Sequence, residues 1–494
     1  MTLFEIRARS AGARWVETAE IRSAIKAIVA QLDGLPLAIE LAAARAAVLA
    51  PPQLLDRLTN RFKLLQGGPR GRDVRQTSLR ALIDWSWDLL EPWEQSALAQ
   101  LSVFHEGFMM DAAEALLDLS SWPEAPWSLD VVGSLLNKSL LYAREVDGTL
   151  RLSMYVSIQE YAMEKLGSNR TETSLRHARH FAQLGHFGTL RELQVVGYGK
   201  RLGSLVMELE NLIAGVNTAL EVDDVALASE CALGAARAFE VSGPFTEGLC
   251  LLDRLEIERV PVGNRARLFM MRGQFLQHLG RWNEAKLTFE AALSAAREAN
   301  ERQLEGKILA RKGWFLSLQG QPEEAAEFYT QALAVHRETG DKWSESGTLA
   351  RYAWLHYLQG RIDQALELYP RSLAMHRELG NRWGEATYTG NWALLLFEQG
   401  RMTEALEYYQ RALSIHRELG NQRSESGTLA NLAILHTQQG RISEALASYE
   451  RALAIIRRLG DRGREAMVYG HLAGIHHHQG RRAEARENYE KAIG

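Results

Sequence analysis

The stretch SGTLARYAWLHYLQGRIDQALELYPRSLAMHRELG, residues 346–380, decides the fold because it is one copy of a pattern that recurs every forty residues. In each copy an alanine follows a glycine after five residues, and an aromatic ring follows four residues later, as in Gly360, Ala365 and Tyr369. The same glycine recurs at Gly280, Gly320, Gly400, Gly440 and Gly480. A second glycine series lies twenty residues out of phase, at Gly340, Gly380, Gly420 and Gly460, with Asn300 in the earlier slot. A fixed period with two evenly spaced helix breakers predicts a stacked two-helix unit.

Within the quoted copy, we expect a first helix through residues 349–356 and a second through residues 365–379. Each ends at a glycine, which suits the left-handed conformation just past a helix end. Ala353 and Ala365 are small enough to let the two backbones approach closely, and Tyr369 is expected to fill the space between units. Pro370 lies inside the second helix, where it removes a backbone donor and should kink the helix at a cost of about 3 kcal/mol.

This pattern resembles the tetratricopeptide repeat, with its small residue in the first helix and its alanine and aromatic residue in the second. The resemblance covers residues 264–494 in six copies that keep phase without a gap. The copies are longer than the usual 34-residue unit and resemble longer-period members of the family with extended helices. The resemblance implies a right-handed solenoid that binds partners rather than one that catalyses a reaction.

Bulk properties exclude several classes of protein. The 494 residues allow two to four domains, and a net charge of -4 gives no general argument for nucleic-acid or membrane binding. Cys231 and Cys250 are too few for a disulfide framework, so a reducing cytoplasm is the expected location. The amino terminus lacks the apolar core of a signal peptide. The sequence also has no uncharged apolar stretch of the length that predicts a membrane-spanning helix. We therefore expect no membrane association.

The amino-terminal third has a different, non-repeating pattern. Residues 18–49 predict two helices around a Gly-Leu-Pro-Leu segment, with Pro36 in a first turn, where its missing donor is harmless. Further helices are expected through residues 78–90, 92–101, 111–117, 129–136 and 158–166. Between the last two, residues 140–144 and 150–154 predict two strands joined at Asp147-Gly148, a strong hairpin signal. Helices followed by a hairpin and a closing helix indicate a winged helix.

These segments, in this order, resemble NB-ARC-like signalling ATPases of the STAND class, particularly bacterial ones. The resemblance rests on GLPLAIELAAAR at residues 34–45, RQTSLR at 75–80, DWSWDLL at 84–90, LSVF at 101–104, GF at 107–108, NKSLL at 137–141 and IQEYA at 158–162. In that family a nucleotide-binding core precedes a helical domain, a winged helix and a repeat sensor. The resemblance implies cytoplasmic signalling, often transcriptional control.

The chain departs from this family where nucleotide would bind. It has no G-x-x-x-x-G-K-[ST] loop to cradle phosphates, no acidic Walker B strand, and Met154-Tyr155-Val156 where many relatives carry Met-His-Asp or Met-Leu-Glu. We therefore expect the back half of such a regulator, from a truncated gene or a split system. The expected function is a non-enzymatic protein- or peptide-binding sensor or scaffold. The alternative is a subunit that completes a switch ATPase with a separately encoded P-loop half.

The expected fold is all-α apart from the hairpin. We predict a helical remnant of the nucleotide-binding module at residues 1–66, a winged-helix-like domain at 74–168, degenerate helical hairpins at 170–260 and six tetratricopeptide repeats at 261–494. The Gly/Pro/Arg-rich residues 67–72 form the linker after the first segment.

Several eye-catching residues have a plain structural interpretation. His476, His477 and His478 are adjacent, so they cannot share one helix face, and we expect solvated histidines and no metal site. His336, His376 and His416 recur because the repeat recurs. Pro36 contacts adenine in relatives with a full core, but here it is treated as a helix start, so no cofactor is expected. The winged helix has no basic recognition helix, so internal packing is preferred over direct nucleic-acid binding. Charged stretches such as Arg297-Glu298 and Arg457-Arg458 are expected to be solvated.

The predicted binding groove follows from the resemblance to tetratricopeptide repeats, which line a concave face with their first helices. The family positions fall on Arg311, Arg351, Asn391, Asn431 and His471, and the same alignment adds Trp314, Trp354, Tyr357 and Phe397. Arginine pairs bind carboxylates bidentately, asparagines bond extended backbones, and rings supply apolar contact area. The groove is therefore predicted to take a protein or an acidic peptide. The alternative is that the tryptophans only pack between repeats.

A second predicted contact surface lies at the carboxyl-terminal end. The last helix breaks off at residues 492–494, and solenoids normally finish with a polar cap. We expect an exposed apolar edge near Leu472, Tyr489 and Ile493 that favours self-association or docking.

Overall fold

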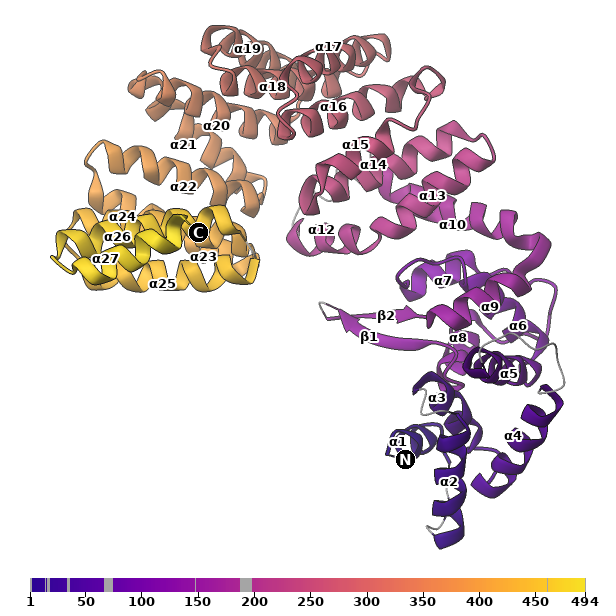
Figure 1. The fold of residues 1–494 in the computed structure, drawn as a ribbon. Coiled ribbons are helices and arrows are strands. Elements are labelled where there is room, and N and C mark those ends of the chain that lie inside the picture. The colour runs from indigo at the N-terminus through magenta and orange to yellow at the C-terminus, as the bar shows by residue number, and fades with distance from the viewer. Residues whose placement is uncertain are drawn as a thin grey trace. The chain divides into compact units, whose positions relative to one another are not determined.

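The computed structural model describes residues 2–13, 15, 18–32, 36–65, 74–146, 148–186, 198–459 and 461–493, and the fold over them is almost entirely helical (Figure 1). The chain divides into two compact units. The amino-terminal unit comprises Met1–Gly185 with Met207–Ala235, and the repeat unit comprises His186–Val206 with Ala236–Gly494. The predicted four-segment division is finer than this and stays a prediction. The predicted linker at residues 67–72 lies outside the described residues.

The amino-terminal unit begins with a small helical layer. Its helices are α1 (Thr2–Ser10), α2 (Ala19–Gln31), α3 (Pro36–Arg45), α4 (Pro51–Leu65) and α5 (Val74–Asp88). Helix α3 starts at Pro36, as predicted, and residues 41–43 are fully buried. It packs on α1 and α5, while α2 packs on α4. Helix α1 was not predicted, because its nine residues have only two buried positions, Phe4 and Ala8.

A winged-helix order follows. Helix α6 (Pro92–Leu101) starts with a proline behind a capping box, and then come α7 (Met110–Leu116), α8 (Ser128–Asn137), strands β1 (Tyr142–Val146) and β2 (Thr149–Ser153), and α9 (Val156–Leu166). The strands pair antiparallel, with Tyr142 opposite Ser153, and Phe108 adds a single bridge to Leu152 on the other edge of β2. The order of these elements matches the one predicted for a winged helix: helix α6, the Phe108 bridge, helices α7 and α8, and then the β1–β2 hairpin. Both strands lie up to two residues from their predicted bounds.

Helix α8 of this module packs on α6 and α7. Helix α8, in the position of a recognition helix, contains no lysine or arginine and buries Val131, Val132 and Leu135. Lys138, just after it, reaches the buried Glu94 carboxylate at 2.5 Å, and Ser134 donates to the same group. Burial would raise the pKa of Glu94, but these donors together hold the pKa below its usual range.

The wing is followed by η1 (Gly167–Asn169), α10 (Arg170–Gly185), α12 (Tyr198–Met207), α13 (Leu209–Glu221) and α14 (Val225–Ser242). A buried polar network ties the wing to the start of α13. Arg151 of β2 forms an ion pair with Glu208 and donates to the Gly107 carbonyl oxygen at 2.9 Å. Asn211 donates to Glu208 and to the same carbonyl, and accepts from the His105 amide. The arginine, glutamate and asparagine are all buried, so the network fixes the wing against α13.

The repeat unit continues through α15 (Phe245–Leu252), η2 (Ile257–Arg259) and α16 (Val262–His278). The remaining helices are α17 (Trp282–Glu298), α18 (Arg302–Leu318), α19 (Pro322–Glu338), α20 (Lys342–Leu358), α21 (Ile362–Glu378), α22 (Arg382–Glu398), α23 (Met402–Glu418), α24 (Gln422–Gln438), α25 (Ile442–Leu459), α26 (Arg462–His478) and α27 (Arg482–Ile493). Each even-numbered helix packs on the odd-numbered one after it. From α16 onward these pairs are the predicted repeats, and the helices extend beyond the predicted ranges.

The glycines act as predicted. Asn300 and every described glycine of the two series have a positive φ, between 54° and 75°, and Gly460 lies outside the described residues. Residues after the second series cap the next helix, and the Asn381 side chain accepts from the Gly384 amide at 2.8 Å. Asp341, Asn421 and Asp461 cap in the same way. Helix α21 runs continuously past Pro370, which lies on its exposed face, where water can satisfy the backbone carbonyl that loses its donor.

The charged stretches are solvent-exposed, as predicted, and their arginines also form ion pairs. Arg297 pairs with Glu305 at 2.8 Å, and Arg457 pairs with Glu465 at 2.9 Å. The same pair, eight residues apart, recurs at Arg337–Glu345, Arg377–Glu385 and Arg417–Glu425. Each joins the end of a second helix to the start of the next first helix. The arginine and the glutamate of each pair recur with the forty-residue period, so the sequence alone could have predicted these ion pairs.

We expect three repeated histidines to make the stability of the repeat unit sensitive to pH. His336, His376 and His416 are buried, and burial lowers the pKa of each to about 4. A histidine in the unfolded chain takes up a proton near its ordinary pKa of 6.5, whereas these stay neutral when folded. Lowering the pH from 7 to 5 should therefore reduce the free energy of unfolding, by about 2 kcal/mol per histidine.

Thermal unfolding followed by circular dichroism at both pH values tests this. The triple variant His336→Leu, His376→Leu and His416→Leu should lose much less stability between pH 7 and pH 5 than the native chain. The exposed pair His477→Gln and His478→Gln is the control and should behave like the native chain. An equal loss in the triple variant and the native chain would contradict the assignment.

Candidate functional site

The first helices of the repeats form one continuous inner surface. Helices α16, α18, α20 and α22 each contact the next first helix directly, in addition to their own second helix. In Figure 1, α16 and α18 lie on the inner side of the curved stack, while α17 and α19 lie on its outer side. Side chains at one position of successive first helices therefore come into register along this surface, which we call the inner face.

The predicted groove position repeats along the inner face with graded exposure. Arg311, Arg351, Asn391 and Asn431 are half-buried, while His471 is exposed and stacks on Tyr449 with ring centroids 5.9 Å apart. The position therefore changes from cationic in α18 and α20 to neutral and polar in α22 and α24. The assignment of these residues to a groove stays a prediction.

The predicted aromatic residues are partly buried. Trp354 and Tyr357 lie against each other with centroids 4.9 Å apart, and both pack, with Phe397, against the core of the last repeats. The Tyr357 hydroxyl donates to the Glu398 carboxylate. Burial first, and this acceptor second, raise the pKa of Tyr357 to about 12. Trp314 is also half-buried. These rings therefore contribute to packing, and each keeps an exposed edge.

A charge cluster lies at the amino-terminal end of the inner face. Glu240 of α14 forms an ion pair with Arg237 of the same helix and with Arg311 of α18, where Nη2 and Oε1 are 3.3 Å apart. Burial would raise the pKa of Glu240, but the two guanidinium groups hold it below its usual range. Burial and then the like charge of Arg351 lower the pKa of Arg311 to about 10.

Sequence reasoning missed Arg237 and Glu240. They precede the periodic copies, so no register connected them to Arg311. The available signal was weak: a charged pair three residues apart in a helix that is otherwise rich in buried alanine.

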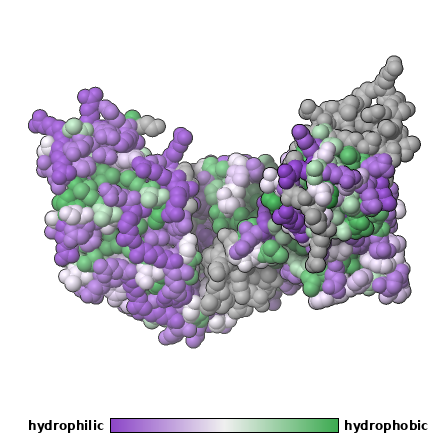
Figure 2. Space-filling view, turned by 90° about the horizontal axis from the view of Figure 1, so that it is seen from below, coloured by the Kyte–Doolittle hydropathy of each residue, from purple (hydrophilic) through white to green (hydrophobic). Residues whose placement is uncertain are grey.

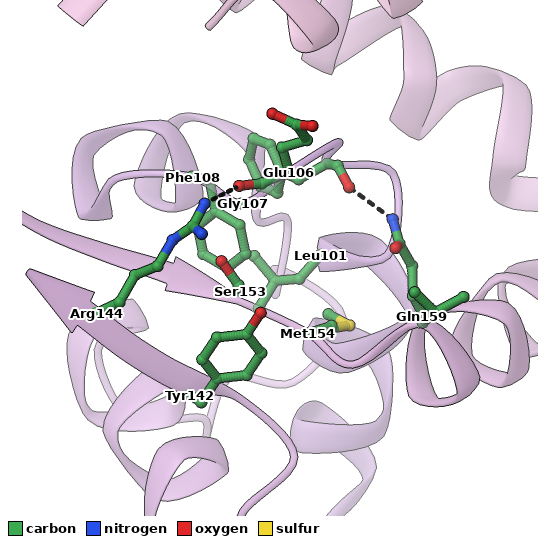
Figure 3. A pocket seen from close by; sticks show the side chains of 11 residues that line it. Leu101, Glu106, Gly107, Phe108, Tyr142, Arg144, Ser153, Met154 and Gln159 are labelled. Atoms are coloured by element: carbon green, nitrogen blue, oxygen red, sulfur yellow. Dashed lines mark hydrogen bonds between the residues drawn. The ribbon is translucent and has the colours of Figure 1, made fainter. Parts of the chain in front are cut away.

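The amino-terminal unit has a separate cavity of about 340 Å³ beside the wing (Figure 3). Tyr142 and Arg144 of β1, Ser153 of β2, and Gln159 of α9 line it. Gln159 donates to the Phe104 carbonyl oxygen at 2.6 Å, and Arg144 donates to that of Glu106 at 3.2 Å. Most polar groups here are thus occupied by the protein itself.

The residues that replace the acidic triplet are held by the amino-terminal helices. The Tyr155 hydroxyl lies 3.4 Å from a Glu40 carboxylate oxygen on α3, and its ring lies against that of Tyr142 with centroids 4.7 Å apart. Burial, followed by Glu40, raises the pKa of Tyr155. Pro36 is exposed at the start of the same α3 helix.

The histidine-rich end of α26 brings no metal-binding group together. The rings of His477 and His478 are in edge contact, 6.1 Å between centroids. Over the described ranges, no three histidine, cysteine, aspartate or glutamate residues are grouped as metal ligands would be. Nor is any helix in these ranges long and apolar enough to span a bilayer.

The apolar edge predicted at the carboxyl-terminal end is smaller than expected. Tyr489 and Ile493 are exposed, at 46% and 88%, but Leu472 is buried at 7% because it packs in the core between the last helices. Leu472 was therefore wrongly included. Figure 2 shows the carboxyl-terminal repeats as mostly hydrophilic, with small hydrophobic patches.

Comparison with known proteins identifies the repeats. The tetratricopeptide repeat family model matches residues 264–338, 315–378, 345–418, 384–458 and 424–494. The carboxyl-terminal part of the chain is thus an array of tetratricopeptide repeats, as the period predicted.

Relatives of part of the chain occur in mycobacteria. A Mycobacterium bovis protein provisionally named an HTH-type transcriptional regulator is 40% identical over 164 residues, which are 33% of this chain and 18% of that protein. An uncharacterized protein of the same species is 33% identical over 184 residues, 37% of this chain and 47% of that protein. The chain thus spans less than half the length of these relatives.

The chain also resembles a solved structure at low similarity. A Signal Transduction ATPase with Numerous Domains from Pyrococcus horikoshii, with a tetratricopeptide repeat sensor, aligns with a TM-score of 0.47 and 17% identity. The alignment covers 92% of this chain and 71% of that one.

Truncating Trp354 and Arg351 to alanine should show which of the two side chains on the inner face contributes to the stability of the fold. Trp354→Ala removes a ring that packs against the core, so it should destabilise the fold by about 2 kcal/mol. Arg351→Ala removes a half-buried side chain with no ion pair among the described residues and should change stability by less than about 0.5 kcal/mol. Thermal unfolding at neutral pH measures both. If the two variants lose the same stability, the structural distinction between these residues is wrong.

Proposed function

We propose that this chain is the ligand-sensing and scaffolding part of a STAND-type signalling or transcriptional regulator, acting without catalysis of its own. The observation that supports this most is the inner face, where tetratricopeptide repeats present half-buried polar groups and ring edges in register. Regular spacing of donors along an extended surface suits an extended peptide, whose backbone groups also recur regularly. The ligand class proposed is therefore a protein segment or peptide bound in extended form.

The similarity to a provisionally named transcriptional regulator supports the regulatory context, and the winged helix supports the same architecture. We propose that this winged helix transmits the state of the repeats rather than contacting DNA. Its recognition-helix position is uncharged except for Asp130, and Lys138 is engaged by Glu94. A module whose third helix is held by buried contacts can pass on a change in its neighbours through those contacts.

A random-peptide display selection on the purified chain tests the binding function. Selected peptides should bind the native chain and bind Asn391→Ala plus Asn431→Ala about tenfold more weakly, because amide hydrogen bonds to the backbone are lost. Thr330→Ala plus Gln410→Ala, on exposed faces of α19 and α23, is the matched control and should bind normally. Failure to enrich any peptide, or equal binding to all three proteins, would argue against this function.

We also expect the purified chain neither to bind nor to hydrolyse ATP, since its sequence has no phosphate-binding loop. Calorimetric titration with ATP should give no binding heat, and Pro36→Ala should leave this result unchanged. Micromolar affinity in both proteins would contradict the expectation.

The alternative role, completing a switch ATPase with a separately encoded P-loop half, is favoured by exposed apolar groups in the amino-terminal helical layer. Ile6 and Val48 are 60% and 85% exposed. If this role is correct, a mixture of this chain with the P-loop half should bind ATP. The double variant Ile6→Ser plus Val48→Ser of this chain should abolish that binding. If the two proteins do not associate, the sensing role stands alone.

A further inference from the structure

The junctions between repeats change in charge along the stack. Each junction contains the end of a second helix and the start of the next first helix, and all junctions share one edge because every hairpin has the same geometry. The first four carry at least as many acidic as basic residues, whereas the fifth carries four arginines and two acidic residues. The five junctions are residues 297–305, 337–345, 377–385, 417–425 and 457–465. Positive charge therefore accumulates at the carboxyl-terminal end of this edge.

One position of the junctions reverses its charge. It holds glutamate in the first four junctions and Arg458 in the fifth. In earlier repeats this glutamate pairs with an arginine at the start of the first helix of the same repeat. Arg302 pairs with Glu338 at 2.8 Å in this way. Arg382 pairs with Glu418 at 2.5 Å. The reversal at Arg458 therefore replaces a recurring ion pair with an added positive charge.

Arg458 and Arg462 carry charges that the protein does not compensate. The position that supplies the arginine in earlier repeats is Gln422 here, so Arg458 faces a neutral side chain instead. Both arginines are exposed, and neither forms an ion pair with any residue that the structure describes. The Nε group of Arg458 donates to the Ala454 carbonyl oxygen at 3.3 Å, which is a neutral acceptor.

Two further arginines extend this charged edge. Arg423 and Arg464 occupy positions at which the other junctions have no basic residue. Arg464 donates to the Arg423 carbonyl oxygen at 2.8 Å, so the fourth and fifth junctions are in contact. Both guanidinium groups share the Asp461 carboxylate, at 3.9 and 3.5 Å. With Arg458 and Arg462, these residues form what we call the arginine edge, which has four arginines around a single carboxylate.

We propose that the arginine edge binds the phosphate backbone of a nucleic acid. Arginine suits phosphate because its planar guanidinium stays charged and donates two parallel hydrogen bonds to phosphate oxygens. The surface differs from both the winged helix and the inner face. The chain as a whole has a net charge of -4, so the contact is confined to this edge and is strongly weakened by salt.

An acidic protein surface fits the arginine edge less well. Protein interfaces bury a central patch enriched in aromatic side chains and ringed by polar ones. Among the described residues of 417–425 and 457–465, no large hydrophobic side chain is exposed. Binding to phosphates needs no such patch, because the release of counterions supplies the free energy of sequence-independent binding. The composition of the edge therefore favours a nucleic acid.

The first test measures binding of a fluorescently labelled duplex DNA by anisotropy. Two duplexes of unrelated sequence should bind the native chain alike, because backbone contacts carry no sequence information. The logarithm of the association constant should fall with the logarithm of the salt concentration with a slope of about -3, since about three phosphates are neutralised. No binding at low salt, or a slope near zero, would overturn the proposal.

The second test uses variants that the repeats themselves supply. Arg458→Glu restores the residue of the other four junctions, and Arg462→Gln introduces the residue found at Gln422, so the double variant should unfold at the native midpoint. It should bind DNA at least about tenfold more weakly at low salt, and its slope should be smaller by about 2. The matched control is Arg361→Glu plus Arg441→Gln, which makes the same change in charge in exposed turns within the hairpins. Equal losses in the two double variants would overturn the assignment to the arginine edge.

The third test identifies the anion through competition with the labelled duplex. Unlabelled duplex DNA and single-stranded RNA of equal length should both displace it, and the stronger competitor identifies the source of the backbone. Polyglutamate that displaces the duplex as well as DNA does, at equal concentration of charge, would overturn the preference for phosphate. The variant Asn391→Ala plus Asn431→Ala should bind DNA normally, so loss of peptide binding and loss of nucleic-acid binding remain distinguishable.

Discussion

The contact between a small residue on each first helix and an aromatic ring on the following helix is the constraint on which the repeat unit depends. The small residue recurs at Gly273, Gly313, Ala353, Ala393, Ala433 and Ala473. At Gly273 a methyl group would lie 2.9 Å from the Phe289 ring, and at Gly313 it would lie 3.1 Å from Tyr329. The later alanines are fully buried beneath the corresponding rings. Close backbone approach sets the angle within each hairpin, and the repetition of that angle sets the curve of the stack.

This constraint has a direct consequence for function. Because every hairpin has the same geometry, equivalent positions on successive first helices face the same way, and the inner face is ordered without a ligand. The rings that fix the hairpins are tyrosines from the second copy to the sixth, and those of Tyr329 and Tyr369 are fully buried.

The sequence predicted most of the fold because its signals were local and repeated. A glycine with positive φ, an alanine and an aromatic ring recur at fixed spacing, and each has a physical reason to occupy its position. The helices that begin at Pro36 and Pro92 and the wing hairpin were also readable, because proline and glycine act on their own neighbourhood. Helix α1 has no such signal, because its short sequence buries only two side chains.

The candidate site was less predictable for a related reason. Period alone placed Arg311, Arg351, Asn391 and Asn431 at equivalent positions, but charge balance depends on groups from outside the period. Glu240 lies in a non-repeating helix, 71 residues before Arg311, and only the fold brings them together. Leu472 was misplaced because burial at the end of a solenoid depends on which side of the last helix a residue faces. The period alone does not identify that side.

Charge is compensated at most of the junctions between repeats but less completely on the inner face. Arg–Glu pairs satisfy the junctions between repeats, and Glu385 alone receives Arg377, Arg382 and Arg411 while almost fully buried. Arg351, by contrast, forms no ion pair with any residue that the structure describes. Groups that weaken a fold without compensation are typical of functional surfaces, where stability is exchanged for recognition. The unpaired charge of Arg351 therefore distinguishes this inner face more than the shape of the solenoid, which many proteins share.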